Sequence, residues 1–136
     1  MRILAIDDEK DTRRLLRDIL GSAGHQVIAA ADAVQGLFYA EIGRFDLILL
    51  DLMMPVMDGR QLARVLARHW NTFDTPIIVL SCLKDEAARR EVRNLGCVSF
   101  LEKPFSPAEL LTTVAACARK YPQVSPAAAR ILPPAV

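Results

Sequence analysis

Four short apolar runs in this chain each end in polar side chains of a kind that does chemistry. The runs cover residues 3–6, 47–50, 77–80 and 98–101, and each is long enough for one buried strand. The polar residues at or just beyond their ends are Asp7, Asp8, Asp51, Ser81 and Lys103. Because the carboxyl ends of parallel strands share one edge of a sheet, we expect these side chains to meet in one pocket. Three carboxylates, a hydroxyl and an ammonium group suit a divalent cation and a phosphoryl group.

The carboxylates predict a metal site. Three acids brought close together repel one another, and a bound cation removes that penalty. Hard oxygen ligands at a partly open site favour Mg²⁺, with Mn²⁺ as the expected substitute. We expect Asp8 and Asp51 to bind the ion directly and Asp7 to act through a water molecule. The backbone carbonyl of Met53 is the candidate third protein ligand.

Asp51 is then the candidate nucleophile. A carboxylate can attack a phosphoryl group and form an acyl phosphate. The metal ion would hold the carboxylate and one phosphoryl oxygen. Lys103 would neutralise a second phosphoryl oxygen, and Ser81 would donate a hydrogen bond to the third. Pro104 follows Lys103, and a cis bond between them would aim the lysine into the pocket. An ordinary trans proline before a helix is the alternative, and both stay open.

The elements between these residues alternate strand and helix signals five times. A further strand is predicted at 27–29, and helices at about 10–23, 33–42, 84–95 and 107–120. Another helix is predicted to begin after Asp58, with Leu62, Val65 and Leu66 facing inward. Asp32, Asp58 and Ser106 are predicted helix caps. The strands are continuously apolar, which is typical of a sheet covered on both faces. We therefore predict an α/β doubly wound fold with a five-stranded parallel sheet in the order 2-1-3-4-5.

Composition narrows the class of protein. The chain has 136 residues, 52% of them hydrophobic, and a formal net charge of +1, so no overall charge favours nucleic acid or a membrane. No apolar stretch predicts a transmembrane helix, and the beginning of the chain does not resemble a signal peptide, so we expect a cytoplasmic location. Three cysteines without C-x-x-C spacing are interpreted as reduced side chains. Residues 1–120 form the predicted domain, and the Pro/Ala-rich residues 121–136 are interpreted as a tail or linker.

The order and spacing of these motifs resemble a response regulator receiver domain of two-component signalling, the CheY-like family. The matching residues are Asp7-Asp8, Asp51 to Pro55, Asp58-Gly59, Ser81 and Lys103-Pro104-Phe105. The resemblance implies a flavodoxin-like (βα)₅ fold and Mg²⁺-dependent phosphorylation of Asp51 by a histidine kinase or histidine phosphotransfer protein. It implies a phosphorelay switch with only self-catalysed phosphotransfer and slow autodephosphorylation, rather than a turnover enzyme. Ser81 takes the place of the switch hydroxyl and Phe100 that of the switch aromatic residue.

The resemblance also implies where a downstream protein binds, namely the face formed by the helix at 84–95, the strand at 98–101 and the helix at 107–120. Receivers that dimerise through this face usually carry acidic residues and an arginine where this chain has Val98, Ser99 and Thr113, which disfavours a charge-paired dimer. The apolar side chains of Met53 and Leu83 flank the expected pocket and cannot orient an attacking water, so we predict a long-lived phosphoryl group.

Two other functions are compatible with parts of the pattern. An aspartate-nucleophile phosphohydrolase would need a second acid two residues after Asp51, where this chain has Met53. A flavin-binding protein on the same scaffold would need a hydroxyl-rich phosphate loop after the first strand, whereas Asp7, Asp8 and Glu9 make that loop acidic.

Overall fold

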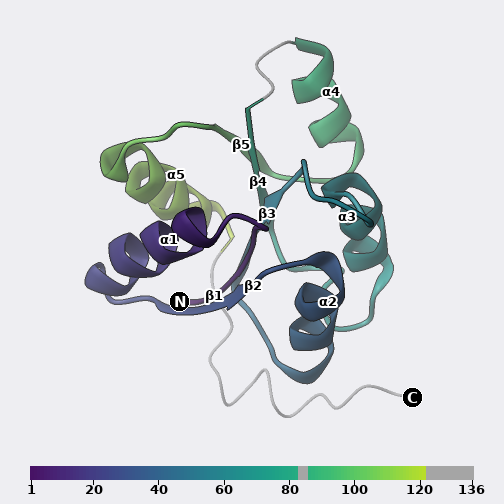
Figure 1. Ribbon diagram of the computed structural model, residues 1–136, viewed down its shortest axis with the longest axis horizontal. Helices are drawn as coiled ribbons and strands as arrows, with labels where there is room; N and C mark the ends of the chain where they lie inside the picture. Colours follow the sequence, from purple (N-terminus) through teal and green to yellow (C-terminus); the bar gives the residue numbers. More distant parts are fainter. Residues whose placement is uncertain (83–85, 122–136) are drawn as a thin grey trace.

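The computed structural model describes residues 1–82 and 86–121, which form a parallel sheet between two layers of helices (Figure 1). The strands are β1 (Arg2–Ile6), β2 (Gln26–Ala30), β3 (Leu47–Asp51), β4 (Ile77–Ser81) and β5 (Ser99–Glu102). The helices are α1 (Lys10–Ser22), α2 (Ala33–Ile42), α3 (Gly59–Arg68), α4 (Glu86–Asn94) and α5 (Pro107–Lys120). The strand order is β2-β1-β3-β4-β5, which confirms the predicted fold class and topology.

Some predictions fall on residues outside this description. They are Leu83, the first two residues of the helix predicted at 84–95, and residues 122–136 of the predicted tail. Among the described residues, none of the helices is long and apolar enough to cross a membrane.

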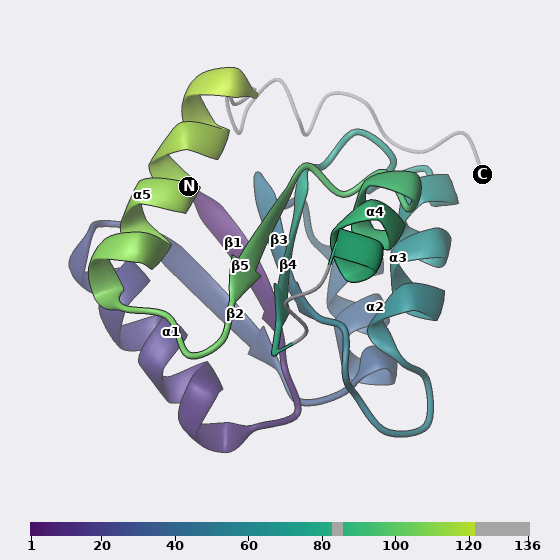
Figure 2. The ribbon, with the colours of Figure 1, turned by 90° about the horizontal axis from the view of Figure 1, so that it is seen from above.

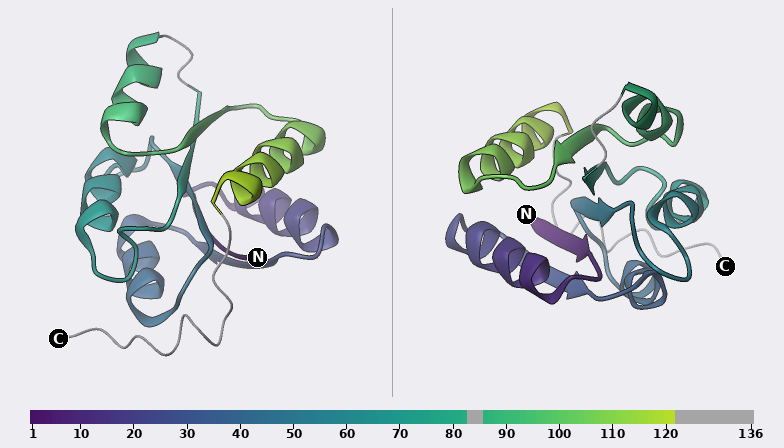
Figure 3. Two further views of the ribbon diagram at one scale, coloured as in Figure 1. Left: turned by 180° about the vertical axis from the view of Figure 1, so that it is seen from behind. Right: turned by 45° about the horizontal axis from the view of Figure 1, so that its top comes forward.

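The helices cover both faces of the sheet, as continuously apolar strands predict. Helices α1 and α5 lie on one face and α2, α3 and α4 on the other (Figures 2 and 3). A separate apolar core fills each interface, and the central strands β3 and β4 are buried along their whole length. The sheet is therefore a rigid platform whose carboxyl edge can hold side chains in fixed positions.

Local signals set the helix ends. The side chains of Asp32 and Asp58 accept hydrogen bonds from the backbone N–H groups of Gln35 and Gln61, and so cap α2 and α3. Ser106 and Glu109 form the predicted capping box at the start of α5. These contacts confirm the three predicted caps.

Gly36 lies inside α2, where glycine disfavours a helix, and packing explains its presence. A Cβ atom at this position would lie 2.7 Å from Cδ1 of Ile6 on β1. The helix therefore approaches the sheet more closely than any larger residue would allow, which compensates for the lower helix propensity.

One of the three residues predicted to face inward from α3 does not do so. Val65 was expected to face inward, but 38% of its surface is exposed, and Ala63 is buried beside Leu62 and Leu66 instead. At 100° per residue, positions 62, 63 and 66 span one side of a helix and position 65 falls outside it. The apolar side chain of Val65 had suggested the wrong edge of the stripe.

Val56, in the loop between β3 and α3, has a φ angle of +70° and is fully exposed. This left-handed conformation is unfavourable for a β-branched residue by about 1–2 kcal/mol, whereas glycine adopts it without a Cβ clash. Glycine loses more backbone entropy on folding, by about 0.5–1 kcal/mol. We predict that Val56→Gly raises the free energy of unfolding by about 0.5–1 kcal/mol in urea titrations.

Val65→Gly is the matched control, because Val65 is also an exposed valine but has ordinary helical geometry in α3. Glycine there should lower the free energy of unfolding by about 0.5 kcal/mol. Equal destabilisation by both substitutions would contradict the strain assigned to Val56.

Candidate functional site

The carboxyl edge of the sheet brings three acids together. Asp7 and Asp8 follow β1, and Asp51 ends β3, the strand beside it. Because Ile6 pairs with Leu50, the register places Asp7 next to Asp51. Carboxylate oxygens of the three residues lie within 4.8 Å of one another; Asp7 and Asp51 are buried and Asp8 is exposed. We call these three residues the acidic cluster.

Lys103, just beyond β5, supplies a positive charge to the acidic cluster. Its Nζ donates a hydrogen bond to Oδ2 of Asp7 at 2.8 Å and to Oε1 of Glu9 at 3.3 Å. It lies 3.6 Å from Oδ2 of Asp51, which is beyond good hydrogen-bond distance. The backbone N–H of Lys103 donates to the carbonyl of Ser81 at 2.8 Å, and the Lys103–Pro104 peptide bond is cis.

Backbone amides orient the two buried carboxylates. The N–H of Met53 donates to Oδ1 of Asp51 at 3.1 Å, and the N–H of Glu9 donates to Oδ1 of Asp7 at 2.9 Å. Arg13 donates to the backbone carbonyl of Asp7 at 2.8 Å. One oxygen of each carboxylate is thereby held by its own loop. The other oxygen, Oδ2, is the one nearest Lys103 in both residues.

The electrostatics show a site with more negative charge than the lysine balances. Burial and the charge of Asp7 raise the pKa of Asp51 to about 7, although the Met53 N–H and Lys103 act in the opposite direction. Burial opposes the charge of Lys103, but its contacts with Asp7, Asp51 and Glu9 outweigh burial and raise the pKa of its ammonium group. A hard divalent cation among the carboxylates fits this donor set and this charge.

Ser81 lies on β4, the neighbour of β3, and Phe100 lies on β5, the edge strand beyond it. Ser81 ends β4, is buried, and comes one residue after Leu80, the register partner of Asp51. Phe100 of β5 is half-buried against the core beneath α4. The Cζ atom of Arg89 on α4 lies 4.9 Å from the centre of the Phe100 ring, a cation–π contact.

Gly59 is a site residue whose role sequence reasoning missed. A Cβ atom at this position would lie 2.3 Å from the backbone oxygen of Asp51, so only glycine lets the first turn of α3 touch the end of β3. Its N–H donates to the carbonyl of Leu52 at 3.0 Å. The Asp58-Gly59 pair signals a turn and a helix start, but it does not reveal this contact.

Comparison with known proteins identifies the same family that the motifs suggested. The family model "Response regulator receiver domain" matches residues 3–115. The chain is 37% identical over 124 residues, 91% of its length, to the probable transcriptional regulator ycf27 of Porphyridium aerugineum. It is 37% identical over 112 residues, 81% of its length, to the cyclic di-GMP phosphodiesterase response regulator RpfG of Xanthomonas campestris pv. campestris (strain 8004).

Solved structures agree with these relatives. Chemotaxis protein CheY4 of Vibrio cholerae superposes with a TM-score of 0.82 at 33% identity, covering 85% of this chain and 97% of that chain. In contrast, the chain spans 50% of the ycf27 protein and 30% of RpfG. The similarity therefore concerns the receiver part of those longer proteins.

The match over residues 3–115, the flavodoxin-like topology and the acidic cluster agree with one another. The cluster is the acidic triad typical of a receiver's Mg²⁺ site, and the family implies a histidine kinase as partner. This chain belongs to the response regulator receiver domain family, the CheY-like phosphoacceptor switches of two-component phosphorelay signalling, and is not a conventional enzyme.

Proposed function

We propose that Asp51 is the residue that accepts the phosphoryl group, from a phosphohistidine on a histidine kinase or histidine phosphotransfer protein. The observation that carries this proposal is the position of its carboxylate. It is only 3% exposed, one oxygen is held by the Met53 N–H, and the other lies 3.6 Å from Lys103. In the transfer, a carboxylate oxygen bonds to phosphorus, the P–N bond breaks, and its electron pair stays on the imidazole.

For the metal we propose Mg²⁺, with Mn²⁺ as a substitute, held directly by Asp8 and Asp51, through water by Asp7, and by the backbone carbonyl of Met53. The proximity of the three carboxylates and their incomplete neutralisation by Lys103 support this assignment. When bound, the ion would neutralise the negative charge of the carboxylate and of the phosphoryl group.

Lys103 and Ser81 complete the proposed site. Lys103 contacts Asp7 and Asp51 from one side and would place its charge beside a phosphoryl oxygen on Asp51. Ser81, on the adjoining strand, would donate a hydrogen bond to another oxygen and act as the switch hydroxyl. When Ser81 moves, Phe100 would change its packing too. The contact of Phe100 with Arg89 would transmit this change to α4.

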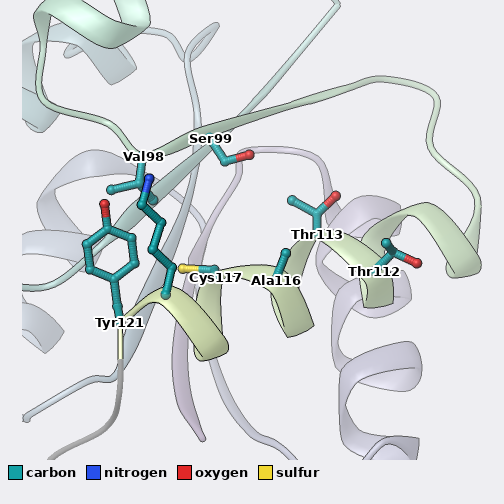
Figure 4. Close-up of a pocket in the computed structure, with 8 residues that line it drawn as sticks. Val98, Ser99, Thr112, Thr113, Ala116, Cys117 and Tyr121 are labelled. Atoms are coloured by element: carbon teal, nitrogen blue, oxygen red, sulfur yellow. The ribbon is translucent and has the colours of Figure 1, made fainter.

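We propose the face formed by α4, β5 and α5 as the site where a downstream protein reads the switch. A hollow of about 440 Å³ lies there, with Arg89 and Phe100 on one side and Thr112 and Thr113 of α5 on the other. A second hollow of about 290 Å³ adjoins it at Thr112 and Thr113 (Figure 4). Val98, Ser99 and Thr113 line this second hollow, so the three positions expected to lack the charges of a charge-paired dimer lie together.

For the rest of the chain we propose that residues 1–120 form the receiver domain and that 121–136 serve as a tail or linker. The net charge of +1 supports a domain that binds proteins rather than nucleic acid or a membrane, and we propose a cytoplasmic location for it. A phosphohydrolase would need a second acid at the position of Met53, which is largely exposed beside the acidic cluster. Because methionine cannot act as that acid, the site favours the phosphoacceptor over the hydrolase.

The first prediction for the site concerns the acceptor. Incubation with a small phosphodonor and Mg²⁺ should add one phosphoryl group to the wild-type chain and none to Asp51→Asn, as measured by intact-mass spectrometry. Asp58→Asn is the matched control, because asparagine also caps a helix and Asp58 lies outside the acidic cluster. Equal labelling of the Asp51 variant would refute the assignment.

The second prediction concerns the lifetime of the acyl phosphate. Met53 cannot position a water for attack, so the phosphorylated wild-type chain should keep its label for minutes or longer after the donor is removed. Met53→Glu should shorten the lifetime severalfold in a phosphate-release assay, because its carboxylate can orient water. Complete loss of the label from the wild type within seconds would contradict this explanation.

The third prediction concerns pH. The pKa of Asp51 is about 7 in the folded chain against an ordinary value of 3.8, so between these values the folded state binds more protons than the unfolded state. The free energy of unfolding of the metal-free protein should therefore fall as pH rises through this window, by a few kcal/mol at most. Asp51→Asn should not show this fall and should be the more stable protein at pH 8.

Urea unfolding in EDTA at pH 5 and pH 8 measures this difference. Millimolar Mg²⁺ should then stabilise the wild type at pH 8 but not Asp51→Asn, because the ion offsets the repulsion among the carboxylates. The electrostatic explanation would be contradicted if the free energy of unfolding of the wild type were the same at pH 5 and pH 8 in EDTA and did not change when Mg²⁺ replaced EDTA.

A further inference from the structure

Helix α2 carries apolar side chains on all of its sides although it lies at the surface. Val34, Phe38 and Ile42 are 73%, 55% and 67% exposed, and their spacing of four residues places them in one stripe along the helix. We call these three residues the α2 stripe. Figure 1 shows α2 at one end of a helix layer, with α3 and α4 following it.

The fold itself does not need the α2 stripe. Ala33, Gly36 and Ala40 pack α2 against the sheet and are buried, so the core is complete without the outer residues. Helix α4 on the same face turns charged residues to solvent, among them Glu86 and Arg93. A helix that is apolar all round normally has a partner on its second side.

The apolar surface extends beyond the helix. Asn71 donates a hydrogen bond from Nδ2 to the carbonyl of Ala40 at 2.7 Å, and Arg44 pairs with Asp74 at 2.9 Å. These contacts fasten the segment 70–74 to the C-terminal end of α2. Trp70 and Phe73 in this segment are 47% and 66% exposed.

The area of this surface agrees with a weak protein–protein contact. The α2 stripe with Trp70 and Phe73 exposes roughly 500 Å² of apolar surface, at the upper end of what monomers usually show. Two such surfaces would bury roughly 1,000 Å², the lower limit for a specific interface.

We propose that the α2 stripe is a self-association surface, on which the α2 helices of two copies of this chain pack antiparallel across a twofold axis at Phe38. The spacing of the stripe makes it self-complementary, because Phe38 meets Phe38 at the axis and Val34 meets Ile42 on either side. Rows of residues four apart are also the ridges that interlock in the commonest mode of helix packing.

The single charged residue of α2 lies off the proposed axis. Oε1 of Glu41 is 3.9 Å from Nε2 of His69 in the same chain, so this carboxylate lies on the flank of α2 that faces the end of α3.

Sedimentation equilibrium of the full 136-residue chain, over concentrations up to about 1 mM, tests the proposal. The wild type should show a reversible monomer–dimer equilibrium. Phe38→Glu places two carboxylates at the axis and should raise the dissociation constant at least tenfold. Leu15→Glu is the matched control, because Leu15 is also a partly exposed apolar residue but lies on α1, across the sheet; its equilibrium should match the wild type.

A charge pair makes the test specific. Phe38→Lys alone should also dissociate, whereas an equimolar mixture of Phe38→Glu and Phe38→Lys should restore the dimer. Far-ultraviolet circular dichroism and labelling by a small phosphodonor confirm that each variant is folded. A wild type that stays monomeric, or a mixture that dissociates as fully as the single variants, would overturn the proposal and leave the α2 stripe to a different partner.

Discussion

The burial of like charges at one edge of the sheet is the constraint on which this structure depends. Asp7 and Asp51 are both removed from water, Asp8 lies beside them, and Lys103 is the cation placed among them. Burial and the charge of Asp7 raise the pKa of Asp51 to about 7, and Lys103, whose short hydrogen bond goes to Asp7, offsets this rise only in part. The fold thus maintains a charge imbalance that a metal ion and a phosphoryl group can use, at a cost to the stability of the metal-free chain.

The scaffold tolerates this repulsion because the surrounding contacts are rigid and close. Two apolar cores hold the sheet from both faces, and the register between β1 and β3 leaves the acids little freedom to separate. Gly59 brings the start of α3 against the backbone of Asp51, and the backbone N–H of Lys103 is tied to Ser81. Positions far apart in the sequence are thereby fixed at hydrogen-bond distances, which suits transfer by positioning and charge neutralisation.

Sequence patterns predicted the features that depend on local chemistry or on topology. The caps at Asp32 and Asp58 are local, and the meeting of Asp7 with Lys103 follows from parallel strands in one sheet order. Features set by the distance between elements were missed. The contact of Arg89 with Phe100 and the close approach at Gly59 depend on how far a helix stands from its neighbours, which no periodicity records.

The two surfaces proposed for binding lie at opposite edges of the sheet, and this separation has a consequence for regulation. Helix α2 packs over β1 and β2, whereas α4 and α5 flank β5. A dimer formed through the α2 stripe therefore leaves the α4–β5–α5 face open to a downstream protein in both copies. Phosphorylation can shift such a dimer only if it alters α2 itself, because a ligand changes an equilibrium only through different affinities for the two states. Association and switching are in this arrangement independent properties of one small domain, set by helices at opposite edges of the sheet.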